Sequence, residues 1–140
     1  MTADLAELPV LVDTSVWIEL LRHTDHPLRQ HLESLVTEDR ARLCAAVVAE
    51  LIQGAVSPKD LAAAQTLAET VPMLEADDSL WLEAGRLARQ LRRRGATVGL
   101  FDCYVAALAI KNDCLLLSLD KHFRLIAKAS TLRLDPLAFH

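Results

Sequence analysis

The sequence LPVLVDTSVWIELL, residues 8–21, joins two different local patterns. The apolar run over residues 8–12 predicts a short buried strand. Asp13 ends that run, and Thr14 or Ser15 is a residue type that caps a following amphipathic helix. A buried strand followed directly by a helix is the unit from which parallel α/β sheets are built.

Short apolar runs and helical periodicity continue to alternate along the rest of the chain. Residues 114–119 form the most strand-like run after the first, and residues 42–45, 71–74 and 132–134 are weaker strand candidates. Segments with apolar residues three and four positions apart separate them and predict helices. This alternation is typical of an α/β domain with a parallel sheet, and the length suits one domain, residues 1–140.

The composition argues against several classes of protein. Hydrophobic residues make up 52% of the chain and aromatic residues only 4%, so Leu, Ala and Val must fill a sizeable core. A formal net charge of -4 does not suggest a strongly basic nucleic-acid binder. The three cysteines have no CxxC spacing, and buried reduced thiols are the simplest interpretation of them.

The chain shows no signal for export or membrane insertion. Residues 1–7 carry two acids and no basic residue, which does not fit a secretory signal. No apolar run approaches the ~18–20 residues that a membrane span needs. We therefore expect a cytoplasmic protein that has no membrane partner.

Two acids directly follow the two best predicted strands. Asp13 ends the first strand, and Asp120 ends the run at residues 114–119. Ligands of open parallel α/β sheets bind outside the carboxyl ends of the strands, so both carboxylates should lie at one edge. Asp102 begins a helix after a glycine-containing loop, and Glu50 lies at the border of the apolar stripe of its helix. We expect all four acids to converge on this edge.

Each acid taken alone has a simpler explanation. Asp13 and Asp102 are residue types that cap helices. Asp120 suits a turn, and Glu50 suits a solvated helix position. Taken together, however, four converging carboxylates repel one another unless they are protonated or neutralised by a cation. Mg²⁺ and Mn²⁺ prefer oxygen ligands, and no Cys/His pattern suggests zinc. Such a metal site suits hydrolysis of phosphodiester bonds without a protein nucleophile.

The segments around the acids have a recognisable order. They are VLVDTSVWI at residues 10–18, AEL at 49–51 followed by Gly54, DCYVAA at 102–107 and LSLDKHF at 117–123. In order and approximate spacing, these segments resemble the four motifs of the PIN-domain ribonucleases, specifically the VapC-type toxins of bacterial toxin–antitoxin modules. The resemblance covers nearly the whole chain. It departs from the family after the third acid, where Cys103 and Tyr104 replace smaller or aliphatic residues.

This resemblance implies a fold, an activity and partners. The fold would be a PIN-like α/β/α sandwich, with a central parallel sheet and helices on both faces. The catalytic residues Asp13, Glu50, Asp102 and Asp120 would line a metal site, and the protein would cut RNA with Mg²⁺ or Mn²⁺. It would be a homodimer, neutralised by a cognate antitoxin whose tail enters the active-site cleft.

Hydroxyl residues stand close to two of the acids. The resemblance implies that Ser15 and Ser118 are supporting residues, which hold a carboxylate or a water at the metal. As the alternative, Ser15 is a helix cap and Ser118 is simply a small strand residue. The spacing along the chain leaves both interpretations open.

Basic residues gather in two places. Arg92, Arg93 and Arg94 crowd the end of one predicted helix, and Lys121 and Arg124 follow the last acid. We predict that these five residues contact RNA phosphates. Cations also complement the dipole at the end of a helix, and an acidic partner or a solvated helix face would explain them as well.

Two other functions compete with ribonuclease activity. One is a non-catalytic binding module that kept the PIN fold and lost its chemistry, although all four acids are present. The other is an aspartyl-phosphate phosphatase or receiver-type domain with Asp13 as the phosphate acceptor. A phosphatase of that kind needs a second Asp two residues further on, where Ser15 stands.

Overall fold

The computed structural model describes residues 4–139, so the first three residues of the N-terminal segment and the last residue of the expected domain lie outside it. Within the described residues, a parallel sheet of three strands has the order β2–β1–β3. The strands are β1 (Val10–Val12), β2 (Ala41–Arg42) and β3 (Leu115–Leu117). Val10 is the partner of both Ala41 and Leu115, so the strands begin level and end at the same edge.

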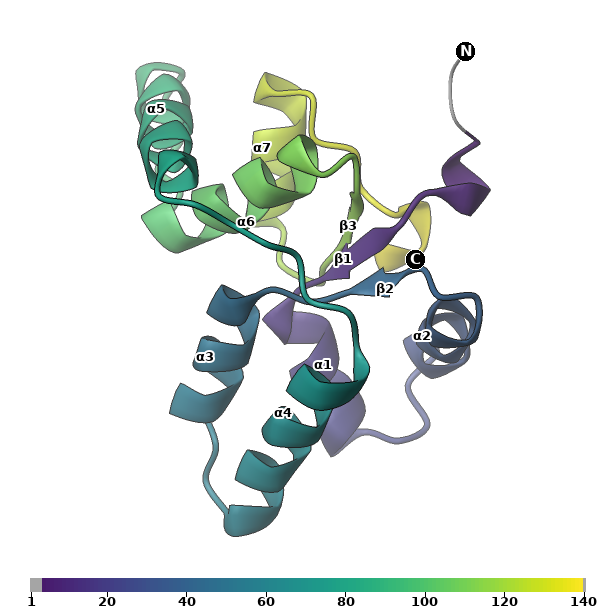
Figure 1. Ribbon diagram of the computed structural model, residues 1–140. Helices are drawn as coiled ribbons and strands as arrows, with labels where there is room; N and C mark the ends of the chain where they lie inside the picture. The colour runs from purple at the N-terminus through teal and green to yellow at the C-terminus, as the bar shows by residue number, and fades with distance from the viewer. Residues whose placement is uncertain (1–3, 140) are drawn as a thin grey trace.

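Helices cover both faces of this sheet (Figure 1). Their bounds are α1 Thr14–Arg22, α2 Leu28–Thr37, α3 Ala45–Gln53, α4 Pro58–Thr70, α5 Ser79–Arg93, α6 Leu100–Lys111 and α7 His122–Ala129, with short 3₁₀ helices η1 at Leu5–Glu7 and η2 at Pro136–Phe139. Figure 1 shows α5, α6 and α7 on one side of the sheet and α1, α3 and α4 on the other. The predicted α/β/α sandwich is confirmed.

The core consists of the sheet and the helix faces that it carries. All three residues of β1 and all three of β3 are buried. The helix α6 is buried along residues 103–109, where it packs between α5 and β3. Three alanines in this stretch, Ala106, Ala107 and Ala109, are small enough to let the helix approach its neighbours closely. The helix is therefore a rigid support for the acid at its start, Asp102.

The sheet is shorter than the sequence predicts. The strand expected at residues 42–45 is found at Ala41–Arg42, because the chain enters α3 at Ala45. The segments 71–74 and 132–134 contribute only single bridges, which pair Met73 with Leu43 and Leu134 with Leu116. Hydrophobicity alone does not show where such segments leave the hydrogen-bonding register of their neighbour.

Local signals explain where several helices begin and end. A capping box starts α4, since the Ser57 hydroxyl accepts from the Asp60 N–H and the Asp60 carboxylate accepts from the Ser57 N–H. Gly95 follows α5 with a φ of 88°, a conformation that favours glycine. The three cysteines are free and buried, as the sequence predicts. In the part of the chain that the structure describes, no helix is long and apolar enough to cross a membrane.

Candidate metal centre

The predicted acids lie at the carboxyl edge of the sheet because three separate elements end or begin there. Asp13 follows β1 directly, and its backbone N–H donates to the Leu117 carbonyl at the end of β3 at 2.9 Å. Asp120 comes three residues after β3, and Asp102 lies in the first turn of α6. Since β1 and β3 are parallel neighbours, their carboxyl ends bring Asp13 and Asp120 to the same edge.

Asp13 is held by two hydroxyls. Its carboxylate is only 5% exposed, and its Oδ2 accepts from Ser15 Oγ at 2.9 Å and from Ser118 Oγ at 2.8 Å. The same hydroxyls accept from the N–H groups of Leu119 and Asp120, each at 3.0 Å. Each serine therefore bridges this carboxylate to the backbone that follows β3.

This arrangement corrects the predicted start of the first helix. Thr14 and Ser15 were both candidates for its cap, but α1 begins at Thr14 with Asp13 in the capping position. The Asp13 carboxylate makes no capping hydrogen bond, because it is bound to Ser15 and Ser118 instead. The simple capping explanation for Asp13 is thus wrong. Both serine hydrogens are directed at Oδ2, and no hydrogen bond to Asp13 Oδ1 is found among the described residues.

A second group of side chains forms around Asp120. Its Oδ1 accepts from the backbone N–H of His122 at 2.9 Å, and the His122 ring turns back toward the same oxygen. His122 Nδ1 lies 3.5 Å from Asp120 Oδ1 and 3.7 Å from Asp102 Oδ2. One ligand atom from each of Asp102, Asp120 and His122 lies within 4.8 Å of the others. Two acids and one imidazole are therefore spaced as ligands of one cation are.

The other three predicted acids all act on the pKa of Asp102 through their charge. The pKa of Asp102 is raised from its ordinary value to about 6. Burial is the largest cause, followed by the negative charges of Asp120 and Asp13, with a smaller contribution from Glu50. His122 opposes this rise. The charges of acids from three other segments of the chain thus reach Asp102, although Asp13 and Glu50 are not part of the close group around it.

Glu50 lies on α3, on the other side of the sheet from α6. It is partly buried, as its position at the border of the apolar stripe predicts. The pKa of the nearby Cys44 thiol is raised mainly by burial, and Asp13 and Glu50 add to the rise through their charge. Glu50 therefore contributes negative potential to this edge from the side opposite Asp102.

The donor set fits a divalent metal ion. Carboxylate oxygens suit Mg²⁺ and Mn²⁺, and an imidazole nitrogen also suits Mn²⁺. A cation would offset the negative charges that, together with burial, raise the pKa of Asp102. Asp102, Asp120 and His122 offer atoms close enough to share it, and Asp13 Oδ1 offers an oxygen that the serines leave open.

His122 is the site residue that the sequence analysis missed. It stands in the segment LSLDKHF, in which the sequence predicts roles for Ser118, Asp120 and Lys121 but not for His122. The signal was its spacing, two residues after an acid at the start of a helix. Sequence spacing does not reveal that the ring turns back over Asp120 and reaches Asp102 on another helix.

The predicted cations are exposed. Arg92, Arg93 and Arg94 are exposed at the end of α5, and Lys121 and Arg124 are exposed at the start of α7. Arg93 and Arg94 line a groove of about 480 Å³ together with Arg86, Arg89 and Gln90. Gln90 joins this groove to α7, because its Nε2 donates to the Ala129 carbonyl at 2.9 Å. Both groups of cations therefore belong to the α5–α6–α7 side of the sheet.

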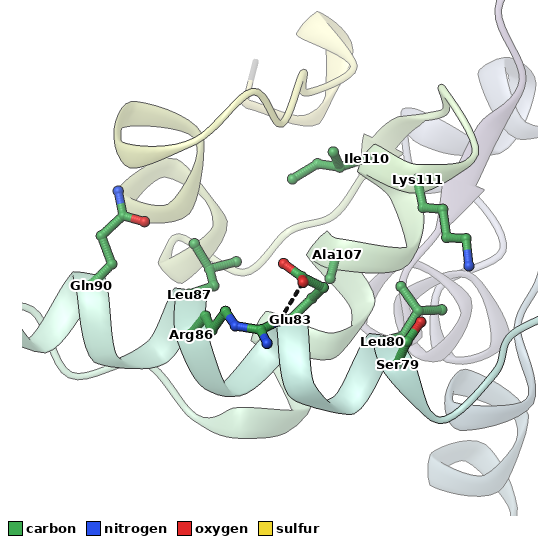
Figure 2. A pocket seen from close by; sticks show the side chains of 9 residues that line it. All are labelled: Ser79, Leu80, Glu83, Arg86, Leu87, Gln90, Ala107, Ile110 and Lys111. Atoms are coloured by element: carbon green, nitrogen blue, oxygen red, sulfur yellow. Dashed lines mark hydrogen bonds and ion pairs between the residues drawn. The ribbon is translucent and has the colours of Figure 1, made fainter.

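A separate hollow of about 400 Å³ lies between α5 and α6 (Figure 2). Leu80, Leu87 and Ile110 line it, and a Glu83–Arg86 ion pair lies at its edge. None of the four predicted acids lines this hollow. The candidate metal centre is thus separate from this hollow.

Comparison with known proteins shows the family to which this chain belongs. The sequence profile of the PIN domain matches residues 10–129, and the chain belongs to the PIN-domain family. Within that family it is similar to the ribonuclease VapC11 of Mycobacterium tuberculosis. The two are 31% identical over 128 residues, which is 89% of this chain and 96% of VapC11.

Solved structures show the same fold. VapBC-1 from nontypeable Haemophilus influenzae superposes with a TM-score of 0.73 at 22% identity, over 91% of this chain and 97% of that one. DNA-bound VapBC from Salmonella typhimurium superposes with a TM-score of 0.75 at 20% identity, over the same shares of the two chains. These likenesses confirm the PIN-like fold.

Proposed function

We propose that this protein is a divalent-metal-dependent endoribonuclease that uses Mg²⁺ or Mn²⁺, and that it is the toxin of a toxin–antitoxin pair. The observation that carries the proposal is the group formed by Asp102, Asp120 and His122, which have one ligand atom each within 4.8 Å of the others. The charges of Asp120, Asp13 and Glu50, which add to the burial that raises the pKa of Asp102, support it. The similarity of this chain to VapC11, which is named as a ribonuclease, supports RNA as the substrate.

We assign the metal to Asp102, Asp120 and Asp13, with Glu50 adding charge from α3. When bound, the metal supplies Lewis acidity and lowers the pKa of water for attack on the phosphodiester. Asp13 presents Oδ1 because Ser15 and Ser118 bind its Oδ2. The serines therefore have a positioning role, since they fix the direction of a buried carboxylate.

The basic residues suit the binding of the substrate. Lys121 and Arg124 stand on the helix that begins beside Asp120, and Arg92, Arg93 and Arg94 add charge on α5. RNA that follows these helices would place a phosphate near the acids. The protein has a net charge of -4, so this local positive surface has to offset repulsion between RNA and the rest of the molecule.

We propose a cognate antitoxin as the protein partner. The VapBC structures that share this fold suggest such a partner. An open, mostly apolar groove of about 320 Å³ lies between α1, α2 and α4, where Trp17, Leu21 and Leu67 line it. We assign the antitoxin to this groove, with its tail reaching the acids, and we expect the complex to contain a homodimer of this chain in the cytoplasm.

The test of the proposed function is cleavage of a labelled RNA by the parent and by Asp13→Asn and Asp102→Asn. We expect cleavage with Mg²⁺ or Mn²⁺, none with EDTA, and none by either variant, while circular dichroism shows a retained fold. Cleavage by D13N at the parental rate would overturn the mechanism. Metal binding without cleavage of any RNA would favour a non-catalytic module.

Trapping of phosphate distinguishes the remaining alternative. An aspartyl-phosphate enzyme would form a phospho-aspartate on Asp13 when it is treated with a phosphoryl donor. We expect none, because Ser15 occupies the place of the second acid and donates to Asp13 instead. A phosphorylated Asp13, detected by mass spectrometry after borohydride reduction, would replace the ribonuclease mechanism.

A further inference from the structure

We propose that the His122 imidazole is a ligand of the metal at this edge, and that it makes the site prefer Mn²⁺ over Mg²⁺. The inference rests on the proposed metal-dependent function. His122 is not one of the four predicted acids, and it offers an imidazole nitrogen instead of a carboxylate oxygen.

The distances around His122 Nδ1 are those of ligands that share a cation. The atom is 3.5 Å from Asp120 Oδ1 and 3.7 Å from Asp102 Oδ2. Both separations are too long for a good direct hydrogen bond. Two ligand atoms at right angles on a metal, each about 2.1 Å from it, lie about 3 Å apart, and opposite ligands lie about 4.2 Å apart. Both separations from His122 Nδ1 fall within that range, and one ligand atom of each of Asp102, Asp120 and His122 lies within 4.8 Å of the others. Side-chain movements of about 1 Å or less would therefore bring the three residues to one ion.

Hydrogen bonds hold the backbone of His122 beside Asp120. The His122 N–H donates to Asp120 Oδ1 at 2.9 Å, which holds the start of α7 against the carboxylate. Asp120 is held in turn, since its own N–H donates to Ser118 Oγ at 3.0 Å. The backbone of His122 therefore belongs to the hydrogen-bonded network that orients Asp13, and its ring, with a side chain 55% exposed, extends from that fixed point toward Asp102 and Asp120.

The type of ligand decides which ion is favoured. Mg²⁺ is a hard cation that binds oxygen and loses its water reluctantly, whereas imidazole nitrogen is a better ligand for Mn²⁺ and later transition metals. A site of carboxylates alone discriminates between the two ions less strongly. A nitrogen from His122 would therefore increase the preference for Mn²⁺.

A second interpretation of His122 predicts the opposite change in metal affinity when the ring is removed. A protonated His122 would act as a cation that neutralises Asp102 and Asp120 and competes with the metal. Removing the ring would then strengthen metal binding. Removing a ligand weakens it, so the direction of the change distinguishes the two roles.

The experiment is calorimetric titration of Mn²⁺ and of Mg²⁺ into the metal-free parent, His122→Ala and His122→Asn. We expect H122A to lose roughly 10-fold or more in Mn²⁺ affinity and much less in Mg²⁺ affinity. H122N, with an amide oxygen, should recover Mg²⁺ binding better than Mn²⁺ binding. His23→Ala is the matched control, because His23 is an exposed histidine at the far end of α1.

Pulsed electron paramagnetic resonance of bound Mn²⁺ gives a direct second measurement on the parent protein. We expect nitrogen modulation from a coordinated imidazole in the parent and in H23A, and its absence in H122A. Unchanged or tighter Mn²⁺ binding by H122A, or no nitrogen signal in the parent, would overturn the inference while leaving the carboxylate site intact. A parent that binds neither ion and cleaves no RNA would overturn the proposed function as well.

Discussion

Ser118 donates a hydrogen bond to Asp13 across 105 positions of the chain, at 2.8 Å between Ser118 Oγ and Asp13 Oδ2. Ser118 has no exposed surface, and Asp13 has almost none. A buried carboxylate needs such hydrogen-bond donors, because burial has removed its hydrating water. The serine also accepts from the Asp120 N–H, so one hydroxyl ties together two of the acids.

Ser118→Ala should destabilise the fold by about 1–3 kcal/mol, because it leaves a buried acceptor and a backbone donor short of a partner. Urea unfolding measures this loss, and RNA cleavage should fall with it as Asp13 loses its orientation. Ser34→Ala, an exposed position on α2, is the control and should stay within about 0.5 kcal/mol of the parent. An equally small effect for S118A would mean that the hydrogen bond contributes nothing.

The metal-free protein should lose stability as the pH rises from about 4 to about 6. The ordinary pKa of an Asp carboxyl is 3.8, and burial and the neighbouring acids raise that of Asp102 to about 6 in the folded protein. Over this interval the folded state therefore holds a proton that the unfolded state has released. Stability then falls with rising pH. Each unit of pKa corresponds to about 1.4 kcal/mol, which sets an upper limit of about 3 kcal/mol for this effect.

Asp102→Asn isolates that contribution, because asparagine carries no charge at any pH. We expect D102N to equal the parent in stability near pH 4 and to exceed it above pH 6, as measured by thermal unfolding in EDTA. The difference should disappear when the parent is saturated with metal. A variant that is less stable than the metal-free parent at pH 7 would contradict the proposed repulsion among the acids.

Divalent metal should raise the melting temperature of the parent. An ion present at 100 times its Kd adds about 2.7 kcal/mol to the free energy of unfolding. For a chain of this size, that corresponds to a rise of several degrees. The rise should be small in Asp120→Asn, which has lost a ligand. Equal rises in the parent and in D120N, measured by differential scanning calorimetry, would place the metal elsewhere.

The arginines of α5 should contribute to RNA binding through charge alone. Arg93→Gln and Arg94→Gln should each weaken binding to a single-stranded RNA in EDTA, where no cleavage occurs. Each phosphate contact contributes about 0.7 to the slope of log K against log salt concentration, and each substitution should reduce the slope by about that amount. Fluorescence anisotropy at several salt concentrations measures it. Arg22→Gln, an exposed arginine at the end of α1, is the control and should not change the slope.

Much of this site follows from simple features of the sequence. Asp13 and Asp120 were located because each follows an apolar run, and the parallel register of β1 and β3 brings their ends together. The resemblance to PIN-domain ribonucleases supplied Asp102 and Glu50 with a role. The fold class was predicted because short buried strands alternate with amphipathic helices along the chain.

The features that the sequence did not predict depend on the directions of side chains in three dimensions. Ser15 was expected to have either a capping or a supporting role, and only the structure shows that its hydroxyl binds Asp13 and the Leu119 N–H. His122 was overlooked because its contact with Asp102 joins two helices. The edge strands were overestimated because Met73 and Leu134 each form a single bridge before the chain turns away.

The network between Asp13, Ser118 and Asp120 also has a consequence for biosynthesis. Asp13 is translated early, whereas Ser118 and Asp120 are translated near the end. The buried Asp13 carboxylate therefore gains its second hydroxyl donor, Ser118, only after β3 has docked beside β1. A nascent chain that stops before residue 118 lacks both that donor and one of the acids. A growing polypeptide should therefore remain harmless to the RNA around the ribosome until most of it has been made.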